Sequence, residues 1–198
     1  NNASGLNTDL KASHSRHYEV GAKWRGARQA LDIAAYEIRT DDELVVDVNA
    51  GGRSTFRNAG RTTRRGIELA HSARWTPEWS TFATFTLLQA RFDDEFLSGS
   101  GSAAAPVHSG NRLPGTPERS AYAELAYAPR WGWGGLNAAV EFVYAGKLYV
   151  DDINSDSTAA AKIFNLRVGL KYRAGALEIE PLVRLDNATD RRYVGSVI

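Results

Sequence analysis

Strict alternation of apolar and polar residues constrains the fold of this chain more than any other feature. Residues 18–25 place Tyr, Val, Ala and Trp on one face and Glu, Gly, Lys and Arg on the other. Residues 164–172 and 177–186 follow the same rule. Because successive side chains of a strand point to opposite faces, a period of two predicts β-strands with one apolar and one polar face.

The pattern predicts about eight strands and no helix. The expected strands are 17–25, 28–40, 61–75, 79–93, 118–130, 135–148, 161–173 and 176–187. Within two of them the alternation changes phase, near Ala35 and Tyr36 and near Leu87 and Leu88. An extra residue in a strand reverses the phase of its side chains, so we expect a β-bulge at each of these two places.

The segments between the strands are alternately short and long. Residues 26–27, 76–78, 130–134 and 174–175 have the length of hairpin turns, whereas 41–60, 94–117 and 149–160 are long and rich in Gly, Ser, Asn and Asp. No segment approaches the roughly 20 apolar residues that a transmembrane helix requires. Short turns on one side and long loops on the other are typical of outer-membrane barrels. The sequence therefore predicts an all-β, antiparallel, up-and-down transmembrane β-barrel, here an incomplete portion of it.

The tryptophans support this prediction independently. All of them lie at or near the short turns: Trp24, Trp75, Trp79, Trp131 and Trp133. Tryptophan prefers the interface between membrane and water, so we expect these residues to form a girdle on one side of the membrane.

Charged residues on the polar faces fit either a barrel lumen or the solvated outside of a soluble β-sandwich. They are Glu19, Lys23, Arg25, Glu68, Arg74, Glu124, Glu141, Arg167, Lys171, Glu178, Glu180 and Arg184. A sandwich binding module therefore remains an alternative, and the asymmetry of turns and tryptophans favours the barrel.

Composition excludes several functional classes. The 198 residues include 24 Lys and Arg against 23 Asp and Glu, which argues against nucleic-acid binding. The chain has no cysteine, and its four histidines lack the spacing of metal ligands. We expect no metal site, no cofactor and no enzymatic activity. The chain also lacks Met and opens on Asn1, so we expect a fragment of a longer protein.

Four local motifs resemble those of TonB-dependent outer-membrane receptors. Residues 57–69 resemble the family's "N-x-G-x-x-x-x-x-G-x-E" stretch, and residues 18–23 resemble its "YEVGxK" strand. Residues 111–117 are similar to its "NRLPGxP" loop exit, and residues 186–193 to its near-terminal "N-x-x-D-x-x-Y". The motifs occur in the family's order and span the chain from about residue 11 to its end.

The resemblance implies a place and a role. Residues 1–198 would form the C-terminal portion of a receptor barrel, without the plug domain and without the final strand. The parent protein would lie in the bacterial outer membrane and import a scarce nutrient, most often a ferric siderophore, with energy from TonB. Its partners would be outer-membrane lipid and lipopolysaccharide, a small iron chelate, and TonB through the missing N-terminal region. A passive porin and an outer-membrane barrel enzyme remain alternatives.

Ligand contacts are expected in the long loops, because loops can vary without breaking the strand ladder. The candidates are His108, Asn111, Arg112, Lys147, Tyr149, Asp151 and Asp152. The motif residues are instead expected to be structural: Gly66, Glu68, Asn187 and Tyr193. Gly66 would permit a close approach in the sheet, and Glu68 would pair with an inward arginine.

Two further charged groups have open interpretations. The acidic triplets 41–43 and 93–95 have the oxygen ligands that a divalent cation prefers, although hydration at the base of a loop explains them better. Arg61, Arg64 and Arg65 suit either lipopolysaccharide or partners in the lumen, because arginine binds phosphate and carboxylate equally well.

Overall fold

A computed structural model describes residues 9–50, 53–99, 104–131 and 134–197. One large antiparallel sheet makes up most of it, and the described residues contain no helix. No helical segment long and apolar enough to cross a membrane therefore occurs in these ranges.

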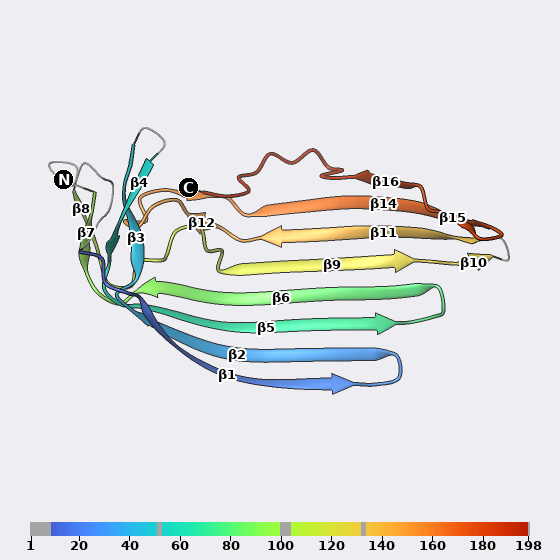
Figure 1. Cartoon of the computed structure of the whole chain (residues 1–198), viewed down its shortest axis with the longest axis horizontal. Coiled ribbons are helices and arrows are strands. Elements are labelled where there is room, and N and C mark those ends of the chain that lie inside the picture. The colour runs from blue at the N-terminus through green and yellow to red at the C-terminus, as the bar shows by residue number, and fades with distance from the viewer. Residues whose placement is uncertain (1–8, 51–52, 100–103, 132–133, 198) are drawn as a thin grey trace.

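The large sheet has ten strands in the described residues, and its main path runs β1-β2-β5-β6-β9-β11-β14-β15 (Figure 1). The strands are β1 (His14–Arg25), β2 (Gln29–Asp41), β5 (Thr62–Arg74), β6 (Trp79–Phe92), β9 (Arg119–Tyr127), β10 (Arg130–Trp131), β11 (Gly134–Ala145), β14 (Ala161–Ala174), β15 (Leu177–Ile179) and β16 (Leu182–Leu185). β10 pairs with β11, and β16 pairs with β14. Consecutive long strands are neighbours, as the up-and-down topology requires.

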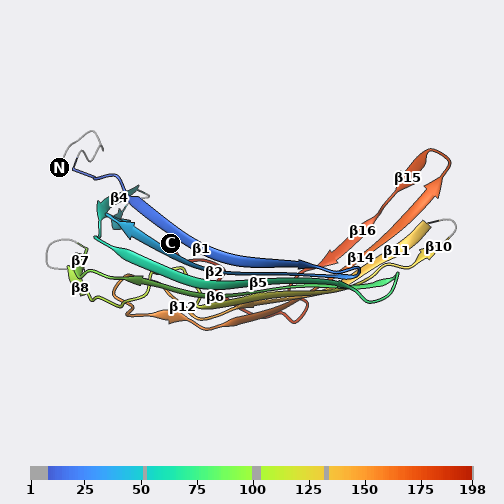
Figure 2. The ribbon, with the colours of Figure 1, turned by 90° about the horizontal axis from the view of Figure 1, so that it is seen from below.

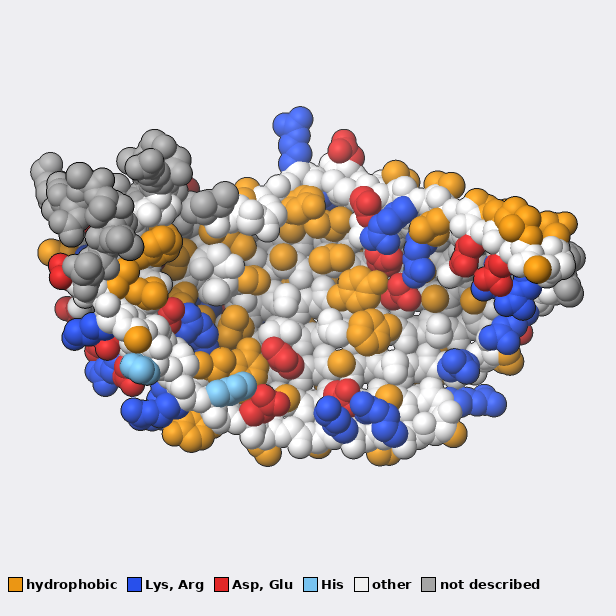
Figure 3. Space-filling view, viewed as in Figure 1, with side chains coloured by type: hydrophobic (Ala, Val, Ile, Leu, Met, Phe, Trp, Pro, Cys, Tyr) orange, Lys and Arg blue, Asp and Glu red, His pale blue; other side chains and the backbone are white. Residues whose placement is uncertain are grey.

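The sheet is curved and does not close into a complete barrel (Figure 2). Charged side chains gather on its concave face over β9, β11 and β14 (Figure 3). The other set of side chains is mostly apolar and exposed, with Val20 and Val183 each 73% exposed. A single curved sheet with one apolar face matches the wall of a membrane barrel, whereas a sandwich would bury that face against a second sheet.

The long loops contain hairpins that lie outside the predicted strands. β3 (Leu44–Ala50) pairs with β4 (Arg53–Asn58), and β7 (Phe96–Ser98) pairs with β8 (Ala105–Val107). β12 (Leu148–Tyr149) pairs with β13 (Ser157–Thr158). All three hairpins lie at one end of the large sheet (Figure 1).

The two predicted bulges are wrong. The registers of β2 with β1 and β5, and of β6 with β5 and β9, run without a shift through both places. Each phase change has another cause. Glu37 lies two residues after Ala35 on β2, and Gln89 two residues after Leu87 on β6, so each polar side chain follows an apolar one on the same face of the sheet. The change of hydrophobicity therefore marks where a strand leaves the apolar band.

The predicted strand 176–187 is interrupted. β15 pairs with the end of β14, and β16 pairs with the middle of β14. Pro181 lies between the two strands and has no backbone N–H to donate to a ladder. The other predicted strands agree with the observed ones within a few residues at each end.

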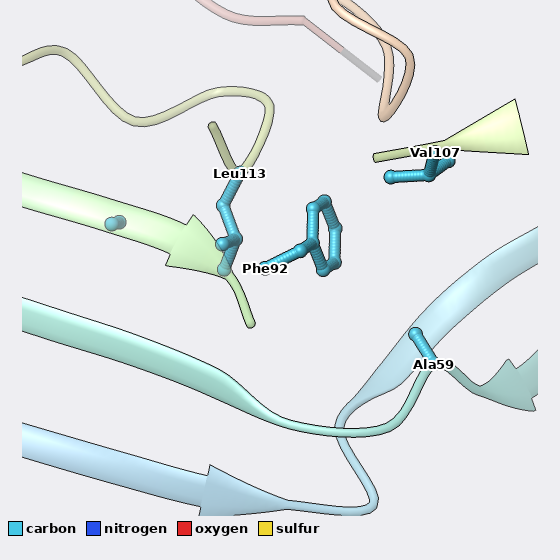
Figure 4. Close-up of a cluster of buried hydrophobic side chains, with 5 residues drawn as sticks. Ala59, Phe92, Val107 and Leu113 are labelled. Atoms are coloured by element: carbon cyan, nitrogen blue, oxygen red, sulfur yellow. The ribbon is translucent and has the colours of Figure 1, made fainter. Parts of the chain in front are cut away.

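A small apolar core lies where the end of β6 meets the long loops. It consists of Ala59, Ala90, Phe92, Val107 and Leu113, each at most 8% exposed (Figure 4). The Phe92 ring also packs edge-on against Phe96, with ring centroids 4.9 Å apart. This core fixes the long loops on the end of the sheet.

Candidate functional site

The two ends of the sheet differ in construction. At the short-turn end the connections are residues 26–28, 75–78, 128–133 and 175–176, and at the long-loop end they are 42–61, 93–118 and 146–160. Figure 1 shows the short turns on the right and the hairpins of the long loops on the left. The candidate ligand residues all belong to the long-loop end.

The loops 93–118 and 146–160 bind each other through three of the candidates. The Asn111 side chain donates to the Asp152 carbonyl at 3.0 Å. The Arg112 backbone N–H donates to Asn154 Oδ1 at 2.7 Å, and Asn154 Nδ2 donates back to the Arg112 carbonyl at 2.9 Å. Asn154 thus pairs with both backbone groups of Arg112 and joins the two loops. We call loops 93–118 and 146–160, joined in this way, the loop platform.

The remaining loop candidates are placed differently. His108 lies at the surface with Glu95, and Nδ1 is 3.5 Å from the Glu95 carboxylate. The Lys147 ammonium lies 4.4 Å from the centre of the Tyr149 ring. The Asp151 carboxylate forms its hydrogen bonds within its own loop, because it accepts from the Ser155 backbone N–H at 2.8 Å. The Tyr149 backbone carbonyl also joins the two loops, because it accepts from the Gly115 N–H at 3.0 Å, while the Tyr149 ring lies beside Lys147.

Asp152 is a half-buried acid in loop 146–160. Burial raises the pKa of its carboxyl, and this effect outweighs the hydrogen bond from Ser98 and the charge of Arg57, which act in the opposite direction. Ser98 Oγ is 3.4 Å from Asp152 Oδ2. A half-buried carboxyl of this kind stabilises the packing of the loops best when it is neutral.

The acidic triplets are used in ion pairs and hydrogen bonds. Arg61 donates to Asp94 through its backbone N–H at 2.9 Å and through its guanidinium at 2.7 Å, which holds the pKa of Asp94 below its ordinary value. Thr62 Oγ1 and Arg64 donate to Glu43 at 2.6 and 2.9 Å. In the part of the chain that the structure describes, no group of three or more His, Asp or Glu side chains is arranged to hold a metal.

The motif in residues 57–69 forms the base of the first long loop. Asn58 Nδ2 donates to the Asp42 carbonyl at 2.8 Å and to the Lys11 carbonyl at 3.1 Å. Gly60 has φ +82°, and a Cβ there would lie 2.8 Å from Asp94 Oδ2. Asn58 and Gly60 are thus structural parts of the motif that its sequence alone did not single out.

Gly66 accepts a close approach, as expected of a structural glycine. It pairs with Tyr36 across β2 and β5, and a Cβ on Gly66 would lie 2.3 Å from Tyr36 Cζ. The expected partner of Glu68 is absent, because within the described residues Glu68 forms no ion pair with an arginine. Its neighbour on the lumen face is instead Tyr36.

Asn187 shapes the near-terminal turn, and Tyr193 is exposed. Asn187 has φ +52° and donates through its backbone N–H to Asn165 Oδ1 at 2.8 Å. Its side chain exchanges hydrogen bonds with the backbone of Arg191, at 2.9 and 3.0 Å. Tyr193 is 49% exposed.

A chain of ion pairs crosses the concave face of β9, β11, β14 and β16. Arg167 donates to Glu124 at 2.8 Å and lies 3.6 Å from Glu141. Arg184 forms a bidentate pair with Glu141, at 2.8 and 2.7 Å. The Glu141 side chain, only 6% exposed, contacts both arginines. We call this group the lumen ladder: Glu124, Glu141, Arg167 and Arg184.

The structure brings four of the five tryptophans to the short-turn end. Trp24, Trp75, Trp79 and Trp131 are each between 41% and 55% exposed, and Trp133 lies outside the described residues. The Trp79 ring packs on Tyr127 with centroids 4.5 Å apart. Trp75 Nε1 donates to Thr81 Oγ1 at 3.0 Å. This arrangement suits a girdle, which stays a prediction.

Comparisons with known proteins agree with this geometry. The family model "TonB dependent receptor-like, beta-barrel" matches residues 1–185. The chain is 28% identical over 118 residues to the catecholate siderophore receptor Fiu of Escherichia coli strain K12. This alignment covers 59% of the chain and 14% of Fiu.

Solved receptor structures share the fold. The ferric yersiniabactin uptake receptor FyuA from Yersinia pestis has 23% identity and a TM-score of 0.71, over 91% of this chain and 26% of FyuA. The ferric preacinetobactin receptor BauA from Acinetobacter baumannii has 17% identity and a TM-score of 0.72, over 90% of this chain and 26% of BauA. The chain thus spans about a quarter of these receptors.

These findings decide among the alternatives. The solved neighbours are receptor barrels, which excludes the sandwich. Members of the matched family are transporters and not enzymes, and they lie in the bacterial outer membrane. The chain therefore belongs to the family of TonB-dependent receptor-like β-barrels, and its curved sheet is part of the wall of an outer-membrane barrel.

Proposed function

We propose that this chain is part of an active transporter that binds a scarce nutrient, most often a ferric siderophore, and imports it with energy from TonB. The match of the family model to residues 1–185 carries this proposal. The printed names of the relatives support the ligand class, because Fiu is a catecholate siderophore receptor and FyuA a ferric yersiniabactin uptake receptor.

The domain assignment follows the same reasoning. Residues 1–198 supply a C-terminal portion of the barrel wall, and a plug domain and the contact with TonB belong to other parts of the receptor. The open edges of the sheet support this assignment, because β1 and the β15 and β16 segment each end the sheet within the described residues. An exposed strand edge in a membrane is costly, since lipid offers its backbone no hydrogen bonds.

The ligand-facing residues are those that the loop platform leaves accessible. Lys147 presents a cation next to the Tyr149 ring, and His108 lies exposed at the top of the neighbouring loop. A ferric catecholate complex is anionic and aromatic, so a cation beside an aromatic ring complements both of its properties. Asn111, Arg112 and Asp152 contribute indirectly by holding the two loops together, and Asp151 by shaping its own loop.

Uptake of radiolabelled iron tests the proposal. Cells without their own siderophore receptors would express the receptor and be given a ferric tris-catecholate complex under iron limitation. We expect uptake that disappears in cells lacking TonB. Equal uptake in the presence and absence of TonB would support a passive porin and contradict the proposal.

A matched pair of lysine variants tests the binding residues. Lys147→Ala removes the cation at the loop platform, and Lys171→Ala removes a lysine that pairs with Glu178 at the short-turn end. We expect Lys147→Ala to raise the half-saturating concentration about tenfold with little change in maximal rate, since a charge-assisted contact is lost. Lys171→Ala should leave both parameters unchanged, and equal effects of the two variants would contradict the assignment.

A further inference from the structure

Cationic side chains gather at the short-turn end of the concave, lumen-facing side of the sheet (Figure 3). Residues separated by an even number of positions share one face of a strand. Arg74 therefore lies on the same face as Glu68 of β5, and Lys171 and Arg173 lie on the same face as Arg167 of β14. All three cations point toward the lumen.

Strand pairing places Arg130 on the same side of the sheet. Arg130 is directly opposite Gly135 of β11, and Gly135 is directly opposite Lys171 of β14. Directly paired residues share a face of the sheet, so Arg130 also faces the lumen.

Three adjoining grooves connect the cations along this end of the sheet. Arg74 lines the first groove, of about 450 Å³, and the second, of about 370 Å³. Arg130 lines the second groove and the third, of about 490 Å³. Because neighbouring grooves share an arginine, they form one continuous cationic path. We call the cations that line it the cationic rim, and they are Arg25, Arg28, Arg74, Arg130, Lys171 and Arg173.

Carboxylates neutralise the cationic rim only in part. The six cations outnumber the carboxylates beside them, which are Asp32, Glu78, Glu178 and Glu180. Glu178 is shared between Lys171 and Arg173, at 2.6 and 2.8 Å. Glu124 also borders the first groove, but it pairs with Arg167 in the lumen ladder. The rim therefore keeps a net positive charge.

Arg74 and Arg130 have no carboxylate partner. Both are exposed, and neither forms an ion pair with another residue that the structure describes. A guanidinium stays protonated at any physiological pH and offers several N–H donors. These two side chains are therefore free to bind an anion in the lumen.

We propose that the cationic rim makes the short-turn mouth of the lumen selective for anions, with Arg74 and Arg130 as the residues that bind an anion on its way out. The short turns of outer-membrane barrels face the periplasm, so this mouth is the exit of the lumen. Rings of Arg or Lys select anions in membrane pores, and a cleft lined by one sign of charge concentrates ions of the opposite sign. This selectivity rests on the proposed import through the lumen, and it acts after the contacts at the loop platform.

The anions that suit the rim are small and carry their charge on oxygen atoms. Guanidinium groups form paired hydrogen bonds with such oxygens, in carboxylates and phosphates alike. Small cations are repelled by the same charges. The exit therefore discriminates by charge, whereas the loops can also discriminate by shape.

Thiol labelling of the full receptor tests this selectivity. The chain has no cysteine, so in a receptor without other cysteines Ala128→Cys supplies the only thiol. Ala128 is exposed and lines both grooves that contain Arg130. Two methanethiosulfonate reagents of similar size are compared in a neutral detergent, an anionic sulfonate and a cationic trimethylammonium compound. Both attack the same thiolate, so the ratio of their rates cancels differences in access.

We expect a ratio of anionic to cationic rates about sevenfold higher than for a small thiol in solution, because a potential of about one kT acts oppositely on the two reagents. The double variant Arg74→Gln and Arg130→Gln should lose most of this preference. Arg16→Gln and Arg119→Gln together remove two exposed arginines from the outer face and should keep it. The preference should also shrink in about 1 M salt, where the Debye length falls to about 3 Å.

Four results would overturn the proposal. They are a ratio equal to that of the thiol in solution, an unchanged ratio in the rim variant, an equal loss in the outer-face variant, and a thiol that neither reagent reaches. The labelling does not depend on TonB, so a failure here is distinct from a failure of the proposed uptake.

The heat-modifiable mobility of each variant on a gel shows whether its barrel is folded. If the double variant of the rim does not fold, Arg74→Gln alone replaces it, because Arg74 is exposed at the end of β5. This single variant should lower the ratio about twofold, since one of the two unpaired charges is lost. An unchanged ratio would contradict the proposal.

Discussion

Gly66 shows how one residue can determine the packing of two strands. The Tyr36 ring lies over Gly66 so closely that a Cβ would meet Cζ at 2.3 Å. Gly66→Ala should displace the ring and destabilise the barrel by about 1–3 kcal/mol, the usual cost of overpacking. The temperature at which the folded band disappears on a semi-native gel measures this loss.

Gly169→Ala is the matched control for Gly66→Ala. It also lies in a long strand, but a Cβ there would meet its nearest neighbours, Leu182 Cδ1 and the Pro181 carbonyl, at 3.4 Å. This distance allows small adjustments, so we expect a smaller effect. If both variants unfold at the same temperature, the contact between Tyr36 and Gly66 has no special role.

Asp152 gives the loop platform a predictable dependence on pH. Burial raises the pKa of Asp152 in the folded loop above its value in the open loop, which is about 3.9. The folded loop therefore binds the proton more strongly, and its stability is greatest below pH 3.9 and falls as the pH rises through the folded pKa. Hydrogen exchange of residues 105–113 should accelerate over this range, beyond the intrinsic effect of pH.

Asp152→Asn should remove this component of the pH dependence, because the amide does not titrate and its oxygen still accepts from Ser98. Asp156→Asn in the same loop serves as the control, since Asp156 is exposed. If the exchange of Asp152→Asn keeps the pH dependence of the parent, Asp152 is not the group responsible.

The lumen ladder attaches β16 to the rest of the sheet. β16 pairs with β14 at only four positions, and Arg184 adds a bidentate pair to the buried Glu141. Arg184→Ala should free β16 from this edge of the sheet, because Glu141 loses its bidentate partner. Hydrogen exchange of residues 182–187 should then increase strongly.

Arg173→Ala is the comparison for the ladder variant. Arg173 pairs with Glu178 at 2.8 Å, but its side chain is 66% exposed. Exposed pairs contribute about 0–1 kcal/mol, so the exchange of β15 should change little. Protection of residues 182–187 that survives in Arg184→Ala would show that the backbone ladder alone holds β16.

The strands were largely predictable because alternation is a local property of the sequence. The period of two in β1 and β14 needs no information about neighbours, and the residues of the short turns identify the hairpins. The bulges were wrong because a change in hydrophobicity at Glu37 and at Gln89 marks the end of the apolar band as well as it would mark an extra residue. The sequence pattern alone does not distinguish these causes.

The candidate site was less predictable, because its contacts join residues far apart in the chain. Asn154 binds Arg112 across 42 positions, and Arg184 binds Glu141 across 43. The sequence identified loops with suitable chemistry, but not which of their residues would be used internally. Asn111 and Asp152 therefore changed from proposed ligand contacts to residues that position the loops.

We predict that the short-turn end of the molecule lies at one membrane interface. Trp24, Trp75, Trp79 and Trp131 lie near this end and are partly exposed. Their fluorescence should be quenched most strongly by probes at the depth of the lipid headgroups, because indole prefers the interface. Strongest quenching by probes at the bilayer centre would contradict the girdle.

Cysteine labelling in intact cells tests the orientation of the barrel wall in the membrane. The chain has no cysteine, so each new thiol in it reports its own position. Ala159 is exposed in a long loop and Ala27 in a short turn, and each is replaced by cysteine in a separate variant. In a receptor without other cysteines, a membrane-impermeant maleimide should label Ala159→Cys in intact cells and Ala27→Cys only after the outer membrane is permeabilised. Labelling of both sites in intact cells, or of Ala27→Cys alone, would contradict this orientation.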